Sequence, residues 1–129
     1  MFLERAPRIL IADDDEELLF SLEKMLTKRN YEVVKAYNGL ECFPLIRETE
    51  PDLILLDIKM PYVSGKEVIE ALSKKGEFLI PIIVMSGNDK FENKLHALEN
   101  GAIDFLAKPF NSADLFGKIH SLLKMAGIA

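Results

Sequence analysis

The stretch from Asp52 to Gly65, DLILLDIKMPYVSG, decides the fold of this chain. Its apolar run over residues 53–56 is too short for a helix and predicts a strand buried on both faces, as in the middle of a parallel sheet. Asp57 ends the run, and Pro61 and Gly65 place a loop directly after it. Open α/β sheets bind ligands beyond the carboxyl ends of their strands. Asp57 is therefore the first candidate for a functional residue.

Length and composition predict one globular domain over residues 1–129, with its core at about 8–124. Apolar residues make up 49% and charged residues 29% of the chain, and no apolar stretch approaches the length of a membrane span. No signal-peptide core follows Met1, and the one cysteine cannot form an internal disulfide, so we expect a cytoplasmic protein. The net charge of −5, without a basic stripe, argues against direct binding of nucleic acid.

Short apolar runs alternate with amphipathic segments along the whole chain, which predicts a parallel sheet with helices on both faces. Pro44 lies inside the second predicted helix and is expected to kink or split it. Asp14 or Asp15 is expected to cap the first helix, and Asn111 or Ser112 the last. The other predicted strands are 8–12, 31–36, 79–85 and 102–107, and the predicted helices are 16–28, 39–48, 65–75, 90–100 and 112–124.

Residues that can carry chemistry follow four of the five predicted strands, and in a parallel sheet these positions meet at one edge. Three carboxylates in one crevice repel each other, and a hard divalent cation such as Mg²⁺ relieves this repulsion. A carboxylate oxygen then remains as a nucleophile, while an ammonium and a hydroxyl hold the oxygens of an anion, which suits phosphoryl transfer. The residues are Asp13, Asp14, Asp57, Ser86 and Lys108.

The same motifs resemble those of response regulator receiver domains. The sequence has DD after the first strand, D-x-x-M-P-x-x-x-G after the third, S-G after the fourth and K-P-F after the fifth. The resemblance covers about 8–124 and implies a chemotaxis-receiver-like, flavodoxin-like α/β fold, a three-layer sandwich whose five-stranded parallel sheet has the order 2-1-3-4-5. It also implies a role in two-component phosphorelay signal transduction, as a phosphoprotein that catalyses only its own phosphotransfer and dephosphorylation.

The resemblance implies a phosphoacceptor and a magnesium site. Asp57 would accept the phosphoryl group of a phosphohistidine on a sensor histidine kinase or phosphotransfer protein. Asp14 would be a direct Mg²⁺ ligand, Asp13 would act mainly through water, and Asp57 and the backbone carbonyl of Lys59 would complete the protein ligands. The side chain of Lys59 is also placed where it could compete with the metal.

The resemblance further implies a conformational switch. Ser86 and Lys108 would bind the phosphoryl oxygens, and Ser86 would follow the phosphate while Phe105 turns inward. This motion would reshape the face formed by the fourth helix, fifth strand and fifth helix, which could contact an effector, an output domain or a second copy of the chain. Ser86 and Phe105 stand where Thr and Tyr are frequent, and the Lys108–Pro109 bond is expected to be cis. Static core packing explains Phe105 nearly as well.

Two other interpretations remain open. The D-x-D formed by Asp13 and Asp15 also fits an aspartate-nucleophile phosphatase of the haloacid dehalogenase type, in which Asp13 would be labelled. Glu17 disfavours that interpretation, because a hydrophobic or threonine residue is expected there. A degenerate receiver that only docks a partner is the third possibility. The kinase, the target and the presence of further domains are outside what the sequence predicts.

Overall fold

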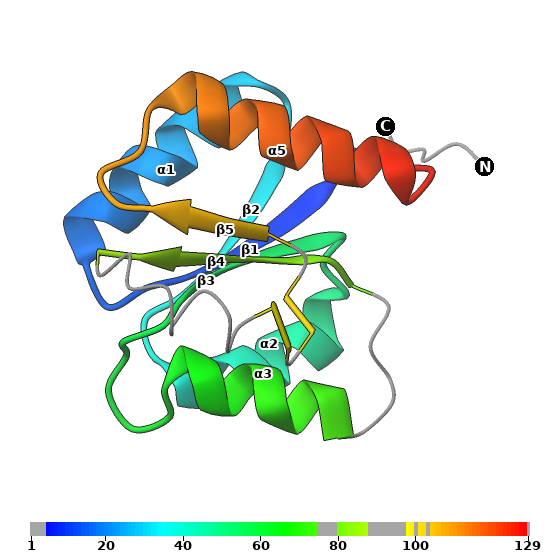
Figure 1. Cartoon of the computed structure of the whole chain (residues 1–129). Coiled ribbons are helices and arrows are strands. Elements are labelled where there is room, and N and C mark those ends of the chain that lie inside the picture. Colours follow the sequence, from blue (N-terminus) through cyan, green and yellow to red (C-terminus); the bar gives the residue numbers. More distant parts are fainter. Residues whose placement is uncertain (1–4, 75–79, 88–97, 100, 103, 129) are drawn as a thin grey trace.

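The structure, a computed structural model, describes residues 5–74, 80–87, 98–99, 101–102 and 104–128 (Figure 1). The predicted helix over 90–100 lies largely outside these residues. The predicted strand over 79–85 has its first residue outside them. The elements in chain order are β1 (Arg8–Ala12), α1 (Glu16–Lys28), β2 (Glu32–Ala36), α2 (Gly39–Thr49), β3 (Leu53–Asp57), α3 (Gly65–Lys74), β4 (Ile82–Ser86), β5 (Asp104–Ala107) and α5 (Ser112–Met125).

The strands form one five-stranded parallel sheet in the order β2-β1-β3-β4-β5, which confirms the predicted fold. Asp57 lies opposite Met85 on β4, and Ser86 lies opposite Ala107 on β5. Because every strand runs in the same direction, the residues at their carboxyl ends meet at one edge. This register brings the predicted site residues together.

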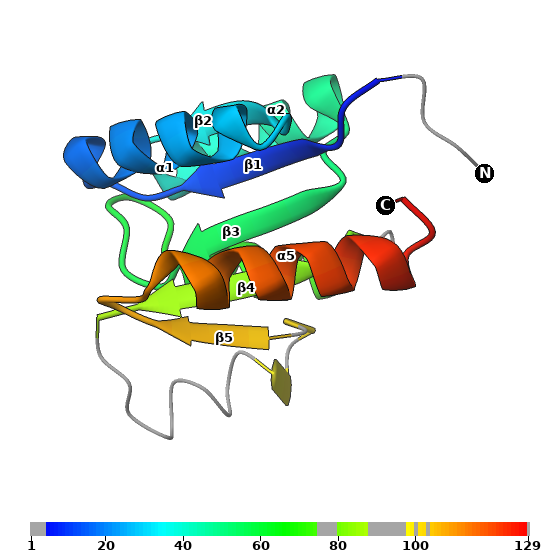
Figure 2. The ribbon, with the colours of Figure 1, turned by 90° about the horizontal axis from the view of Figure 1, so that it is seen from above.

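Helices cover both faces of the sheet. The helices α1 and α5 lie on one face, and α2 and α3 lie on the other (Figure 1). Figure 2 looks onto the face that α1 and α5 cover. Alternate residues of β3 enter different core clusters, since Leu53 and Leu55 pack with α1 and α5 while Ile54 and Leu56 pack towards α2 and α3. Every residue of β3 is buried, as its continuous apolar run predicted.

Side chains cap the starts of α1, α2, α3 and α5. The carboxylate of Asp15 accepts from Leu18 N, and Asn111 Oδ1 accepts from Asp114 N, so each of these caps is one of the two residues predicted for it. The helix α2 runs unbroken through Pro44, so the predicted split is wrong, and the kink stays a prediction. Phe43 and Ile46, on either side of the proline, pack against the same core cluster, and this packing holds the helix together despite the missing N–H donor.

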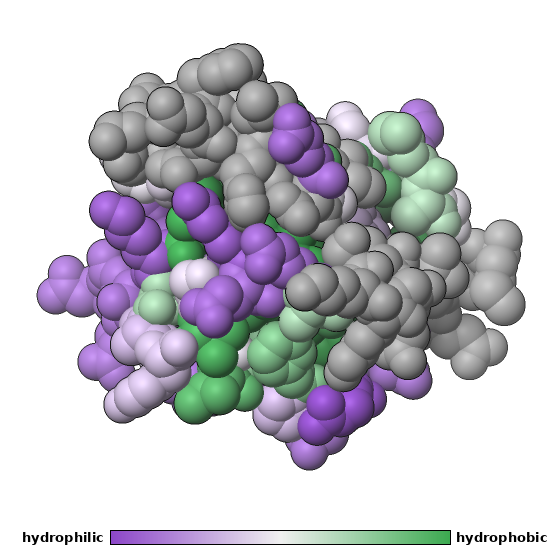
Figure 3. All heavy atoms as spheres, turned by 60° about the horizontal axis from the view of Figure 1, so that its bottom comes forward, coloured by the Kyte–Doolittle hydropathy of each residue, from purple (hydrophilic) through white to green (hydrophobic). Residues whose placement is uncertain are grey.

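The surface over α2 and α3 mixes hydrophilic side chains with apolar patches (Figure 3). Leu40 on α2 is 55% exposed and Tyr62, between β3 and α3, is 79% exposed. Within the described residues, no helix is both long enough and apolar enough to cross a membrane.

Candidate functional site

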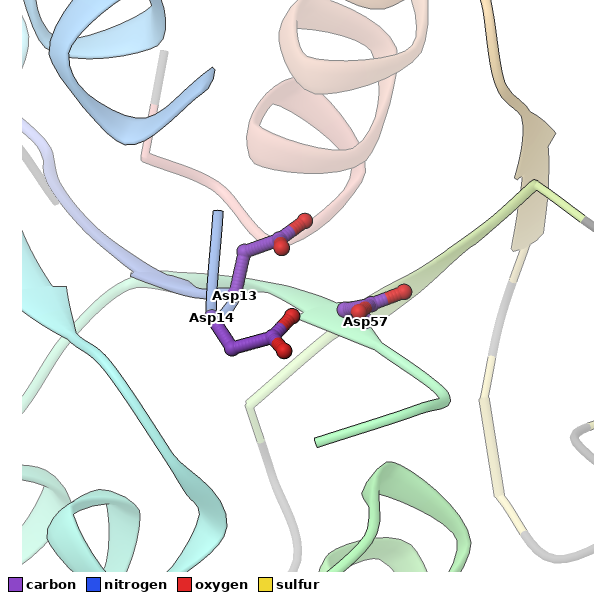
Figure 4. Close-up of side chains that lie close together, drawn as sticks. All are labelled: Asp13, Asp14 and Asp57. Carbon is purple, nitrogen blue, oxygen red and sulfur yellow. The ribbon is translucent and has the colours of Figure 1, made fainter. Parts of the chain in front are cut away.

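Three carboxylates meet at the carboxyl edge of the sheet. Asp13 and Asp14 follow β1, and Asp57 ends β3 (Figure 4). One oxygen from each lies within 4.8 Å of the others. Asp13 and Asp57 are buried, with 1% and 6% exposed, whereas Asp14 is exposed. The cluster is therefore anchored in the protein and reached by solvent from the side of Asp14.

Lys108 is the cation that faces this cluster. Its Nζ lies 2.6 Å from Asp13 Oδ2 and 3.4 Å from Asp57 Oδ1. The backbone N–H of Lys108 donates to the carbonyl of Ser86 at 2.8 Å, which ties the loop after β5 to the end of β4. The Lys108–Pro109 peptide bond is cis, as expected. Lys108 thus lies next to the acids, as its position directly after the fifth strand predicted.

The site residues surround an open hollow of about 360 Å³. A water molecule occupies about 30 Å³ in the liquid, so a hydrated ion fits in this space. Ser86 is buried, with 3% exposed, and Lys59 is exposed on the loop after β3. Residues from four strand ends, those of β1, β3, β4 and β5, and from the β3–α3 loop thus line one hollow. The lining residues are Asp14, Asp57, Lys59, Ser86, Gly87 and Lys108.

Burial and neighbouring charge perturb the acid at the centre. Burial of Asp57 raises the pKa of its carboxyl group to about 6, and the charge of Asp13 adds to this rise while Lys108 opposes it. Burial lowers the pKa of Lys108, but its hydrogen bond to Asp13 and the charges of Asp57 and Asp13 together raise that pKa above its ordinary value. Lys108 is therefore a permanent cation, and Asp57 is an acid whose charge is only partly compensated.

The donor set fits a hard cation bound partly through water. Mg²⁺ takes oxygen ligands at about 2.0–2.1 Å, so two opposite ligands lie about 4.2 Å apart. One oxygen from each of the three carboxylates lies within 4.8 Å of the others, so the cluster has about the span of a magnesium coordination sphere. Asp13 already accepts from Asp15 N at 2.9 Å and from Lys108 at 2.6 Å, whereas Asp14 is exposed. The cluster therefore suits one or two direct carboxylate ligands with waters between.

The loop after β3 packs tightly against the acceptor strand. Gly65 N–H donates to Ile58 O at 2.8 Å, and a Cβ at Gly65 would lie 2.1 Å from the carbonyl oxygen of Asp57. Only glycine fits at such a close backbone approach. The glycine of the predicted loop motif is thus required by its contact with Asp57.

A second hollow, of about 510 Å³, adjoins the first and was not predicted. Asp14 and Lys59 line both hollows, and Lys66 from the first turn of α3 lines only the second. No motif marks Lys66; the only sequence signal was its position just after the loop. The other lining residues are Ile58, Met60, Pro61 and Ser64.

Phe105 lies on the α2–α3 side of the sheet. It is half-buried and packs against the core cluster on that face. Its neighbour Asp104 pairs with Lys118 on α5 at 3.0 Å. The ring is therefore part of the core here, and this packing is compatible with either interpretation of Phe105.

Comparison with known proteins gives consistent matches. The sequence model of a family described as "Response regulator receiver domain" matches residues 9–120. The chain is 38% identical over 122 residues to the transcriptional regulatory protein PrrA of Mycobacterium tuberculosis, a match that covers 95% of this chain and 52% of that protein. The chain therefore spans about half the length of such curated relatives.

Solved structures match over nearly their whole length. A CheY-like response regulator receiver domain protein from Methanospirillum hungatei has a TM-score of 0.88 at 34% identity, with 95% of this chain and 97% of that chain covered. The BeF3-activated N-terminal receiver domain of Klebsiella pneumoniae RstA has a TM-score of 0.85 at 29% identity, with 91% and 98% covered.

Proposed function

The chain belongs to the response regulator receiver domain family of two-component systems, and we propose that Asp57 is its phosphoacceptor. The donor is a phosphohistidine on a sensor histidine kinase or a phosphotransfer protein. The observation that carries this proposal is a buried carboxylate, Asp57, 3.4 Å from the ammonium of Lys108 in an open hollow. Asp14 also lines this hollow, and Asp13 belongs to the same carboxylate cluster.

Asp57 acts as the nucleophile. Its carboxylate oxygen forms the new bond to phosphorus, while the bond from phosphorus to the imidazole nitrogen breaks and leaves its electron pair on that nitrogen. The pKa of about 6 keeps most Asp57 ionised near neutral pH, so the attacking form is available. The product is a mixed anhydride, and its hydrolysis returns the chain to its first state.

Lys108 and Ser86 bind the phosphoryl oxygens. The ammonium of Lys108 is held beside the acceptor by its contact with Asp13, so it need not be recruited when negative charge arrives. Ser86 ends β4 and lines the same hollow, with its hydroxyl as the polar group. Both groups are carried by strand ends that the sheet register fixes.

Asp13, Asp14, Asp57 and the backbone carbonyl of Lys59 form the proposed Mg²⁺ site. The bound metal would neutralise charge on the phosphoryl oxygens. Asp14 is exposed and suits direct ligation, whereas both oxygens of Asp13 already accept hydrogen bonds and suit a contact through water. The side chain of Lys59 lines the hollow, where it lowers the need for a cation.

The phosphorylated state is read by a partner. Phosphate adds nearly two negative charges, which draws Ser86 towards the phosphoryl group and lets the half-buried ring of Phe105 turn inward. A downstream effector, an output domain or a second copy of the chain would contact the face that includes β5 and α5. The chain thus acts as a single signalling domain that turns over no metabolite.

The test is labelling with acetyl phosphate and Mg²⁺, followed by peptide mass spectrometry. We expect one phosphoryl group on Asp57, and none after Asp57→Asn. The control is Asp52→Asn, an aspartate at the other end of the same strand region, which should be labelled like the wild type. Label on Asp13, with repeated turnover of small phosphoesters, would support the phosphatase interpretation instead, and no metal-dependent label at all would support a degenerate receiver.

A further inference from the structure

The start of α2 presses against the loop that follows the acceptor strand. A Cβ built on Gly39, the first residue of α2, would lie 1.8 Å from the carbonyl oxygen of Val63 and 2.6 Å from its carbonyl carbon. Both are backbone atoms, so the collision could not be relieved by turning a side chain. The two segments are separated in sequence by β3 and meet only because of the fold.

Glycine at this position is explained by space and not by backbone conformation. Gly39 does not have a positive φ, so its backbone is open to other residues. Glycine is also a poor helix former, and alanine would favour the first turn of α2. The contact with Val63 is thus the feature of the structure that requires a missing Cβ.

The start of α2 is itself held firmly. Asn38 Oδ1 accepts from Glu41 N at 3.1 Å, and Glu41 Oε1 accepts from Tyr37 N at 2.7 Å. Glu41 accepts from the residue before the cap and not from the cap itself, so this is a variant of the capping box that still satisfies two backbone donors. The β3–α3 loop therefore contacts a helix start whose backbone is held in place by hydrogen bonds.

From Val63, short contacts lead to the acceptor. Val63 N–H donates to Pro61 O at 2.9 Å, and Gly65 N–H donates to Ile58 O at 2.8 Å. A Cβ on Gly65 would collide with the carbonyl oxygen of Asp57, as described above, so the two backbone segments lie close together. A displacement of Val63 is therefore transmitted to the backbone of residues 57–59.

We propose that Gly39 is a positioning residue for phosphorylation. The capped start of α2 contacts the β3–α3 loop at Gly39 and thereby fixes the position of this loop and of the Asp57–Lys59 backbone. This inference rests on the proposed function of Asp57. Misplacement of reacting groups by about 1 Å can cost on the order of 100-fold in rate, so a forced shift of this loop has a measurable effect.

The main test compares two glycine-to-alanine changes. In Gly39→Ala the new methyl group meets Val63, whereas in Gly117→Ala, on α5, no atom lies within 4 Å of the new Cβ. We titrate each protein with Mg²⁺ alone and then measure the rate of labelling by acetyl phosphate. We expect Gly39→Ala to weaken Mg²⁺ binding about tenfold and to slow labelling by at least as much, with Gly117→Ala close to wild type. A folded Gly39→Ala protein that matches Gly117→Ala in both measurements would overturn the proposal.

A second comparison separates positioning from loss of stability. Ile119→Val removes a methyl group from the core on the opposite face of the sheet and destabilises the chain without touching the loop. If the proposal holds, Ile119→Val lowers the urea midpoint while its Mg²⁺ affinity stays at the wild-type value. An equal loss of affinity in Ile119→Val would mean that stability alone governs binding, which contradicts the proposal.

The capping box provides a further variant if Gly39→Ala does not fold. Glu41→Ala removes the acceptor of the Tyr37 N–H and makes the start of α2 less rigid without adding atoms. Glu41→Gln keeps an acceptor oxygen. We expect roughly threefold weaker Mg²⁺ binding for the alanine variant and wild-type binding for the glutamine variant. Unchanged binding in Glu41→Ala would overturn the proposal. Wild-type protein that is never labelled on Asp57 would instead refute the proposed function.

Discussion

The amino and carboxyl ends of the sheet differ in how their charges are paired. At the amino end, Arg5 Nη1 lies 3.0 Å from Asp52 Oδ2, and Arg8 Nη2 lies 3.1 Å from Glu32 Oε2. The backbone N–H of Arg8 also donates to Asp52 at 2.7 Å, and its guanidinium donates to the carbonyl of Thr49. Asp52 and Glu32 thus each have a cation of their own.

At the carboxyl end, Asp13, Asp14 and Asp57 share Lys108, with Lys59 at the rim. Two of these acids are buried, where uncompensated charge is most costly. The charges at the amino end of the sheet, where no ligand is proposed to bind, are thus paired with one another. The carboxyl end keeps an excess of negative charge where a cation and a phosphoryl group are proposed to bind. Four predictions test this contrast.

The largest effect is expected from the shared cation. Lys108→Ala removes the ammonium beside Asp57 and should slow labelling by acetyl phosphate by about 100-fold or more. The matched control is Lys118→Ala, which breaks the surface pair with Asp104 and should leave the labelling rate unchanged. Similar rates for the two variants would remove the distinction between the site lysine and a surface lysine.

Magnesium should stabilise the chain through its carboxyl end only. At a Mg²⁺ concentration 100 times its dissociation constant, the free energy of unfolding should rise by about 2.7 kcal/mol, and a chelator should reverse this. The gain should shrink in Asp14→Asn and persist in Asp52→Asn, measured as urea midpoints with and without Mg²⁺. A gain of equal size in Asp14→Asn would place the ion elsewhere.

Without metal, the charge of Asp57 should destabilise the folded chain near neutral pH. Its pKa is about 6 in the folded state and 3.8 in an ordinary setting, so the folded chain binds a proton more tightly than the unfolded chain. Stability should therefore rise as pH falls from about 6 to about 4, and Asp57→Asn should lose this slope and gain about 1–3 kcal/mol at pH 7.5. Asp52→Asn should instead be destabilising, because it breaks a paired acid. A destabilised Asp57→Asn protein at pH 7.5 would contradict the contrast.

The smallest effect is expected from the exposed pair at the amino end. Arg5→Ala should cost less than about 1 kcal/mol of unfolding free energy, and the loss should diminish at high salt. Urea unfolding at low and high ionic strength measures this. A larger, salt-independent loss would show that the amino end is not merely neutralised but structurally decisive.

Much of the fold follows from local sequence signals. The apolar run 53–56 predicted a strand buried on both faces, and in the structure two separate core clusters take its alternate residues. The caps Asp15 and Asn111 were each one of two candidates, since neighbouring polar residues are equivalent until the backbone direction is known. Of the kink or split expected at Pro44, the split does not occur, because packing on both sides of the proline is a tertiary effect that the sequence pattern does not show.

The sequence predicted which residues form the site but not which of them contact each other. Strand ends placed Lys108 beside the acids, but that its closest partner is Asp13 depends on side-chain conformation. The contact between Gly39 and Val63 was also missed, because the start of α2 and the β3–α3 loop are distant in sequence and no pattern marks where they meet. Such approaches depend on how helices settle on the sheet, which periodicity alone does not specify.

One practical consequence follows from the position of Asp57 at the end of a strand. The next residue, Ile58, still donates its N–H to Met85 O at 3.2 Å, so the backbone at the acceptor is anchored to β4. A fluorescent dye aimed at detecting the modification thus belongs on a loop and not on the strands. Tyr62, 79% exposed and between Pro61 and Val63, is a suitable attachment point. A chain that carries an environment-sensitive dye there would serve as an optical biosensor of kinase activity in real time.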